Sequence, residues 1–273
     1  MELFEYLRKR NFYVDRNTAV VLDHVVSDRP AAVMLRGPPG VGKTELTRLA
    51  AEALDAQYVY FQATPNASED ELLYRFIPSN EGITLGLGPL PQALMLSHHG
   101  PVVLTIDEWD KTRPSADALL LDFLQNFRVS LYVDGKLTTY DGKPENIVVF
   151  LTSNDTREFS EPLLRRVVII ELYHLSESAV REILLSKFDE KLAEFLTKIY
   201  ARTLIARLRK PATVQELIAL GRAILKNPDM PLEVLLRAFA VKYQDDWNRF
   251  AYDVHFLKPH YDALVQELRA RAP

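Results

Sequence analysis

The chain has 273 residues, enough for one large or two modest domains, and its 48% hydrophobic and 26% charged residues are ordinary for a globular protein. A formal net charge of −4 argues against a general nucleic-acid binder, because neutralising phosphates requires a basic surface. The absence of cysteine excludes disulfides, thiolate nucleophiles and cysteine-ligated metals.

Five short apolar runs are continuous rather than alternating, which predicts buried strands of a parallel sheet with helices on both faces. These runs are residues 31–35, 58–61, 102–106, 147–151 and 167–170. Helical patterns occupy residues 44–54, 69–75, 90–97 and 115–127, and residues 68–71 have the form of a capping box. The alternation of strands and helices predicts an α/β layered fold.

Two stretches interrupt this alternation. Residues 129–133 and 137–140 flank an Asp-Gly-Lys turn and predict a β-hairpin. Residues 80–91 are too rich in glycine for a helix, so we expect a projecting loop or a small hairpin there.

Beyond about residue 172 the pattern becomes almost entirely helical. Thr213 and Glu216 form a second predicted capping box, at the start of a helix that continues to about residue 226. We therefore predict an α/β core over residues 1–174 and an α-helical domain over residues 175–273.

Residues 37–44 read Gly-Pro-Pro-Gly-Val-Gly-Lys-Thr, which fits the phosphate loop G-x-x-x-x-G-K-[ST] at all four fixed positions. The motif lies between a predicted strand and a predicted helix, which disfavours a chance Gly-Pro turn. Its glycines let backbone N–H groups point at phosphate oxygens, and the N-terminus of the following helix adds attraction. Lys43 is predicted to reach the β- and γ-phosphates and Thr44 to ligate Mg²⁺. The predicted nucleotide-binding residues are Gly37, Pro38, Pro39, Gly40, Val41, Gly42, Lys43, Thr44, Glu45 and Asp107.

Two adjacent acids follow the strand predicted at residues 102–106. Asp107 is predicted to hold Mg²⁺ opposite Thr44, and Glu108 to orient or deprotonate the attacking water as a general base. Two solvated acids are the alternative. After a complete phosphate loop, however, the pair favours hydrolysis over phosphoryl transfer to a small acceptor.

Three further polar residues are candidates for catalysis. Asn154 ends the next predicted strand, and its amide could reach the lytic water or the γ-phosphate, although such an Asn is often a turn former. Arg165 and Arg166 precede the last predicted strand. They are either plain surface charge or an arginine finger that stabilises transition-state charge on a neighbouring subunit's nucleotide.

In this order, the motifs resemble those of the AAA+ ATPase superfamily and, within it, the MoxR-like branch, which includes CbbQ- and NorQ-type proteins. The resemblance covers about residues 20–225. A glycine-rich stretch before Gly88-Pro89-Leu90 favours the MoxR-like branch. The matching segments are residues 37–44, 88–90 with 93–94, 107–108 with 110–111, 151–154 and 163–166.

The resemblance implies a P-loop NTPase core of five parallel strands, an α-helical lid and a ring, usually a hexamer, with ATP bound between subunits. By match to the motifs, Asn154 is the sensor 1 residue and Arg166 or Arg165 the arginine finger. The resemblance also implies that residues 80–91 line or overhang the pore, where such proteins engage substrates. The hairpin near Asp134 is then the insertion that precedes sensor 1.

One position departs from the pattern of the MoxR-like branch. The lid helix usually begins near an arginine, the sensor 2 residue, but here the expected position holds Val214. Arg209 or Lys210 could substitute from the preceding loop, although solvated charges at a helix–loop junction are the simpler interpretation.

The leading interpretation is an ATP-driven remodelling enzyme that acts on a separate protein client. The alternatives are a nucleic-acid-directed AAA+ motor of restriction or clamp-loader type, which the negative net charge disfavours, and a nucleotide-gated scaffold. No apolar run is long enough to span a membrane and no signal peptide is recognisable, so we expect a soluble, cytoplasmic protein. Aromatic residues near the C-terminus recur at roughly helical spacing, which favours core packing over partner docking. They are Tyr243, Trp247, Phe250, Tyr252 and Phe256.

Overall fold

The computed structural model describes residues 3–65, 70–79, 82–133 and 135–271. It divides into two compact units. The first contains the chain up to Pro38 together with Gly42–Tyr173, and the second contains Pro39–Val41 and the chain from His174 onward. None of the helices in the described ranges is long and apolar enough to cross a membrane.

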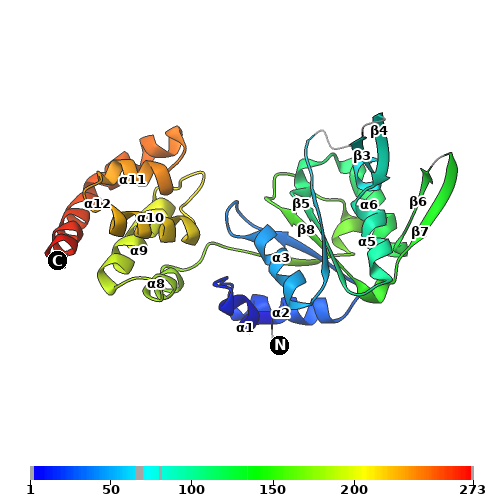
Figure 1. Cartoon of the computed structure of the whole chain (residues 1–273), viewed down its shortest axis with the longest axis horizontal. Helices are drawn as coiled ribbons and strands as arrows, with labels where there is room; N and C mark the ends of the chain where they lie inside the picture. Colours follow the sequence, from blue (N-terminus) through cyan, green and yellow to red (C-terminus); the bar gives the residue numbers. More distant parts are fainter. Residues whose placement is uncertain (1–2, 66–69, 80–81, 134, 272–273) are drawn as a thin grey trace. The chain divides into compact units, whose positions relative to one another are not determined.

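A five-stranded parallel sheet is the centre of the first unit, in the order β2-β5-β8-β1-β9 (Figure 1). The prediction of a parallel P-loop NTPase sheet is thereby confirmed. The strands are β1 (Ala31–Arg36), β2 (Gln57–Gln62), β5 (Val102–Asp107), β8 (Ile147–Ser153) and β9 (Val168–Glu171). Because the strands are parallel, their carboxyl ends lie at one edge of the sheet, where Asp107 and Ser153 end neighbouring strands.

Helices cover both faces of this sheet. On one face lie α2 (Arg16–Ser27) and α3 (Lys43–Ala53), and α1 (Leu3–Lys9) packs beside them (Figure 1). On the other lie α5 (Pro89–Ser97) and α6 (Asp117–Asn126), followed along the chain by the short α7 (Glu161–Leu164).

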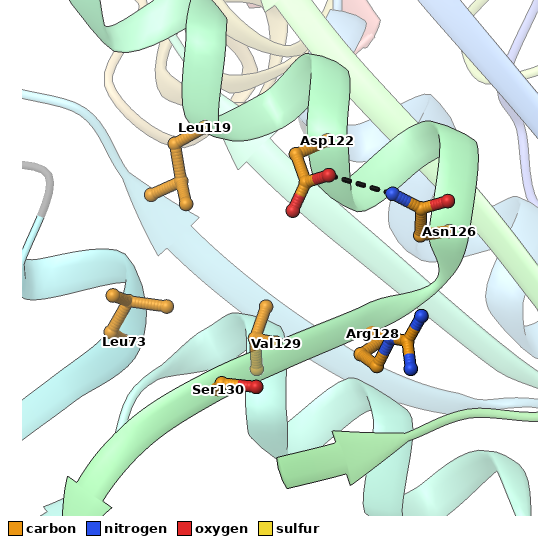
Figure 2. A pocket seen from close by; sticks show the side chains of 7 residues that line it. All are labelled: Leu73, Leu119, Asp122, Asn126, Arg128, Val129 and Ser130. Atoms are coloured by element: carbon orange, nitrogen blue, oxygen red, sulfur yellow. Dashed lines mark hydrogen bonds between the residues drawn. The ribbon is translucent and has the colours of Figure 1, made fainter. Parts of the chain in front are cut away.

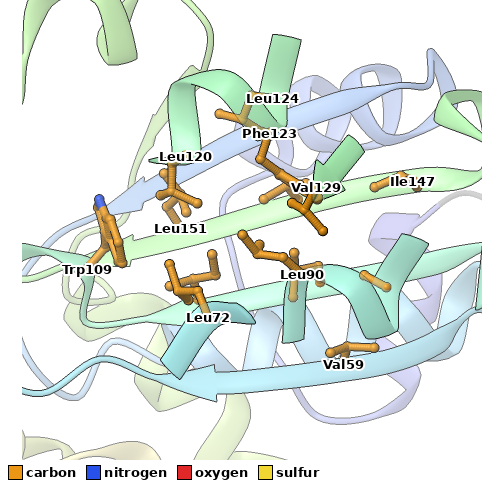
Figure 3. Close-up of a cluster of buried hydrophobic side chains, with 14 of the residues drawn as sticks. Val59, Leu72, Leu90, Trp109, Leu120, Phe123, Leu124, Val129, Ile147 and Leu151 are labelled. Atoms are coloured by element: carbon orange, nitrogen blue, oxygen red, sulfur yellow. The ribbon is translucent and has the colours of Figure 1, made fainter. Parts of the chain in front are cut away.

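The core under α5 and α6 consists of apolar side chains from alternate strand positions. Leu151 of β8 packs in one cluster with Leu90 of α5 and Phe123 of α6, all three fully buried (Figure 3). Each Å² of apolar surface removed from water stabilises the folded state by about 25 cal/mol, so such clusters are the main source of the fold's stability.

Burial on both faces holds for the central strands but not for the edge strands. All residues of β5 and β8 are buried, as predicted. In β9 only Ile170 is buried, and in β2 only Val59, because an edge strand has one neighbour and is less covered.

The helix predicted at residues 69–75 is correct for residues 70–73 and wrong for residues 74 and 75. Only α4 (Asp70–Leu73) forms, and β3 (Tyr74–Ser79) follows at once, paired with β4 (Gly82–Leu87) in an antiparallel hairpin. The glycine-rich stretch is therefore half of a hairpin, one of the two predicted alternatives. Residues 68, 69, 80 and 81, which the capping-box and loop predictions include, lie outside the described residues.

The second predicted hairpin is present as β6 (Arg128–Val133) and β7 (Lys136–Asp141). Gly135 has a φ of +75°, a conformation that favours glycine. Asp134, the first residue of the predicted turn, lies outside the described residues.

The second unit is helical and has its own apolar core. Its helices are α8 (Glu177–Leu185), α9 (Glu190–Ile205), α10 (Val214–Lys226), α11 (Leu232–Phe239) and α12 (Gln244–Arg271). The capping box that opens α10 is formed: Glu216 N donates to Thr213 Oγ1 at 3.2 Å, and Thr213 N to Glu216 Oε2 at 2.8 Å.

The C-terminal aromatic residues divide between core and surface. Phe250 is fully buried, as core packing predicts, whereas Tyr252 is 80% exposed and Phe256 43%. The guanidinium of Arg202 lies over the Phe256 ring, 3.7 Å from its centroid.

Candidate nucleotide-binding site

Two glycines of the phosphate loop have backbone conformations that a side chain would disfavour. Gly37 has a φ of +145°, and a Cβ there would lie 2.1 Å from the carbonyl oxygen of Leu172. Gly42 has a φ of +93°, and it caps α3 without a side-chain hydrogen bond. The first N–H groups of α3 are thus left for an anion such as a phosphate.

Lys43 is almost completely buried at the start of α3. Its ammonium donates to the carbonyl oxygens of Gly37 at 2.7 Å and Pro38 at 3.0 Å, and to Asn154 Oδ1 at 2.8 Å. Burial lowers the pKa of Lys43, and the negative charges of Asp110, Asp107 and Glu108 oppose this change. A buried cation bonded to the loop's own carbonyl oxygens is well placed to neutralise a phosphate.

Asp107 is buried at the end of β5 and accepts three hydrogen bonds. Thr44 and Thr152 donate to its Oδ1 at 2.7 and 2.6 Å, and the Tyr60 hydroxyl donates to Oδ2 at 3.0 Å. The Thr44 hydroxyl and the Asp107 carboxylate are therefore adjacent oxygen ligands of the kind that Mg²⁺ prefers. Magnesium usually keeps several waters, so this small donor set fits it even though no cluster of three His, Asp or Glu ligands occurs among the described residues.

Glu108 lies beside Asp107 with a backbone φ of +57°, which is unusual for a residue other than glycine. Its carboxylate accepts from Lys111 Nζ at 2.5 Å, Gln62 Nε2 at 3.0 Å and Asn154 Nδ2 at 3.4 Å. Burial alone would raise the pKa of Glu108, but these hydrogen bonds outweigh it and lower the pKa below its ordinary 4.5. The carboxylate is therefore ionised at neutral pH, as a general base must be.

The Lys111 contact gives a pH prediction. The pKa of Glu108 is lowered, so turnover should persist as the pH falls to about 5 and decline only below the ordinary carboxylate pKa. Lys111→Met removes the hydrogen bond that lowers the pKa of Glu108 most. The decline of turnover at acidic pH, the acid limb of the pH profile, should therefore move to higher pH. The measurement is the pH dependence of kcat/KM. Lys136→Met, at an exposed position of β7, is the matched control and should leave the limb in place. An unmoved limb in Lys111→Met would contradict the role of this contact.

Asn154 connects the phosphate loop with the acid that follows β5, because its side chain contacts both Lys43 and Glu108. Glu45, by contrast, faces along its own helix and pairs with Arg48 at 2.5 Å. Of the remaining phosphate-loop residues, Pro39–Val41 are grouped with the second unit.

The two arginine candidates do not join this network. Arg165 has a 74% exposed side chain and pairs with Glu161, while Arg166 donates to Pro162 O at 3.1 Å and Gln125 Oε1 at 2.8 Å. Their exposure leaves both accessible to a second subunit.

The sensor 2 candidates make contacts within the second unit. The backbone N–H groups of Arg209 and Lys210 donate to Asp246, and Lys210 Nζ lies 3.4 Å from Glu216 Oε1. Val214 packs against the core of that unit.

Sequence reasoning missed three supporting residues: Tyr60 and Gln62 on β2, and Thr152 on β8. They meet the two acids only because β2 and β8 lie on either side of β5 in the sheet. Each is a polar side chain in or at the end of an apolar strand, which is the signal that could have identified them.

A hollow of about 350 Å³ lies apart from these residues, between α6 and the start of β6 (Figure 2). Two of its polar residues, Asp122 and Asn126 on α6, are hydrogen-bonded to each other at 2.6 Å. It contains none of the predicted site residues. The lining is Leu73, Leu119, Asp122, Asn126, Arg128, Val129 and Ser130.

Comparison with known proteins agrees with this geometry. Residues 32–167, which include the phosphate loop, both acids and both arginines, match the AAA domain of the dynein-related subfamily. Residues 32–167 are thus an AAA domain.

Curated relatives of this chain include proteins of two kinds. Spastin of Drosophila mojavensis is 27% identical over 208 residues, which are 74% of this chain and 25% of spastin. The mitochondrial Lon protease homologue of Yarrowia lipolytica is 32% identical over 149 residues, 51% of this chain and 12% of that protein. The Lon protease of Borrelia duttonii is 30% identical over 157 residues, 54% and 18% of the two chains. The chain thus matches a quarter or less of these relatives' lengths.

Proposed function

We propose that this chain is an AAA+ ATPase that hydrolyses Mg-ATP between the subunits of a ring, usually a hexamer, and uses the energy to remodel or activate a separate protein client, as MoxR-like proteins do. The observation that carries the proposal is the continuous network from Lys43 through Asn154 to Glu108. It joins a buried ammonium and a carboxylate at one edge of the sheet, which supports a phosphate-binding role for the first and a general-base role for the second.

The N–H groups of the phosphate loop and Lys43 hold the β- and γ-phosphates. Glu108 takes a proton from a water molecule as the oxygen of that water attacks the γ-phosphorus. The bond from that phosphorus to the bridging oxygen breaks, and ADP and phosphate leave. Thr44 and Asp107 would hold Mg²⁺, which neutralises charge on the phosphate oxygens when it is bound.

The client proposal rests on the two hairpins of the first unit. Phe76 on β3 is 67% exposed, and Tyr132 and Leu137 on the second hairpin are 64% and 62% exposed. Exposed apolar side chains on projecting hairpins suit contact with an unfolded or partly unfolded polypeptide.

The test is phosphate release by the purified protein with Mg-ATP, measured over a range of protein concentrations and with EDTA. We expect specific activity to rise with concentration as rings assemble, and EDTA to abolish it. Negligible turnover in assembled rings would favour a nucleotide-gated scaffold. Strong stimulation by DNA with a steep salt dependence would favour a nucleic-acid motor.

The exposed arginines give a prediction about the ring. Arg166→Ala should lower kcat by about a thousandfold, because an arginine finger contributes about that much to phosphoryl transfer, and leave ATP binding unchanged. Arg165→Ala is the matched comparison and should be milder, since Arg165 already pairs with Glu161.

Mixing subunits tests whether the arginine acts on a neighbour. Arg166→Ala and Glu108→Gln are each expected to be nearly inactive alone. A mixed ring contains sites that combine an intact Glu108 with an intact Arg166 from the next subunit, so phosphate release should reappear. No recovery in mixed rings of normal size would contradict a finger supplied in trans.

A further inference from the structure

Asp110 is a buried acid in the site for which the proposed reaction has no role. It lies in the short 3-10 turn η1 (Trp109–Lys111) directly after β5 and is only 4% exposed. A carboxylate almost never occupies such a position without strong partners.

One oxygen of Asp110 binds the segment that follows β8. Its Oδ2 accepts from the backbone N–H groups of Asn154 and Thr156, both at 3.2 Å, and from Thr156 Oγ1 at 2.6 Å. Asp155, between them, has a φ of +62°, so the chain turns sharply here. The three donors therefore hold this turn against a single carboxylate oxygen.

The other oxygen, Oδ1, is buried and has no hydrogen-bond partner among the residues that the structure describes. A buried acceptor without a partner destabilises the fold, so folding stability alone does not explain the residue.

Asn154 is the residue through which Asp110 can affect catalysis. The Asn154 side chain contacts Lys43 at 2.8 Å and Glu108 at 3.4 Å, and its backbone is held by Asp110. A shift of the turn would move the amide relative to both groups, and small displacements of positioning groups cost large factors in rate.

We propose that Asp110 is a positioning residue that fixes Asn154 through the turn at residues 154–156 and so sets the rate of hydrolysis rather than the affinity for nucleotide. This inference rests on the proposed ATP hydrolysis.

The main variant is Asp110→Asn, which keeps the shape of the side chain but removes its charge and weakens its acceptance of three hydrogen bonds. We expect kcat to fall by about tenfold or more, with the Kd for a fluorescent ATP analogue unchanged within about twofold. Asp122→Asn, an exposed acid of α6, is the charge-matched control and should behave as wild type. Thr156→Val removes only the hydroxyl contact and should give a smaller loss of kcat, which provides a second variant if Asp110→Asn does not fold.

Combination with Asn154→Ala separates positioning from a general structural role. If Asp110 acts through the Asn154 side chain, Asp110→Asn or Thr156→Val should cost little further activity in the Asn154→Ala background. Equal losses in both backgrounds, an unchanged kcat, or loss of nucleotide binding would each overturn the inference. If wild type itself shows no Mg-ATP turnover that Glu108→Gln removes, the proposed function fails instead.

Discussion

Replacing Glu108 by glutamine is expected to lower ATP turnover by at least about a hundredfold, because a general base typically contributes 10²–10⁴-fold to rate. Glutamine keeps the size of the side chain and can still accept from Lys111 and Gln62, so the local structure should persist. It cannot take a proton from water. ATP should therefore bind but remain intact.

The measurement has two parts: phosphate release at steady state, and binding of a fluorescent ATP analogue. Glu194→Gln is the matched control, because Glu194 is an exposed acid of α9 that pairs with Lys198 and belongs to none of the predicted site residues. It should retain wild-type turnover. Unchanged turnover in Glu108→Gln would refute the assignment of the base, whereas lost binding would show that the carboxylate has a structural role.

The same variant identifies the client. With ATP bound and hydrolysis blocked, a remodelling enzyme should stay in its substrate-engaged state, so a client should co-purify with Glu108→Gln in the presence of ATP. The control is the same purification without nucleotide. Equal recovery of a protein in both would indicate binding that is independent of the ATPase cycle.

The fold could be predicted wherever a single local sequence pattern determines the secondary structure. The strands β5 and β8 are continuous apolar runs, and burial on both faces is the only stable environment for such strands. Residues 69–75 could not be predicted in this way. Tyr74 leaves the helical pattern because it pairs with Leu87 thirteen residues later, and such a pairing is not visible in local propensity.

The candidate site was also predictable only where local sequence motifs define it. Lys43, Thr44 and Asp107 could be located because the chemistry of phosphates and magnesium fixes the residue types and spacing of their motifs. Gln62, which donates to Glu108, was not predictable, because it reaches that residue across the sheet. The register that pairs Gln62 with Asp107 is set by tertiary packing of β2 against β5.

The arginines illustrate a different limit. In a single chain the described part of the structure shows Arg166 bonded to Pro162 and Gln125. A finger acts on another subunit's nucleotide, so its role is determined by assembly, which neither the sequence nor one subunit contains. For this reason the kcat values of Arg165→Ala and Arg166→Ala, rather than geometry, decide between the two arginines, and the mixing experiment tests whether Arg166 acts on a neighbour.

The second prediction with a large effect concerns Lys43. Lys43→Met should weaken ATP binding by about a hundredfold or more, since loss of even one charge-assisted hydrogen bond of about 1.5–3 kcal/mol changes Kd about tenfold to a hundredfold, and Lys43 is predicted to contact two phosphates. Binding of a fluorescent ATP analogue measures the change directly.

Stability should respond differently from binding. Folding lowers the pKa of Lys43, which means that the ammonium is less favourable in the folded protein than in the unfolded chain at neutral pH. Methionine removes this charge and keeps the length of the stem, so we expect the Tm without nucleotide to stay within about 4 °C of wild type, equivalent to about 1 kcal/mol.

Thermal unfolding with and without Mg-ATP combines the two expectations. Wild type should gain Tm with nucleotide by mass action, and Lys43→Met should gain almost nothing. Lys9→Met, at the exposed end of α1, is the matched control and should gain as much as wild type. A normal nucleotide-dependent gain in Lys43→Met would show that the buried ammonium is only a structural bond to Gly37 and Pro38, and the phosphate loop would then lose its proposed role.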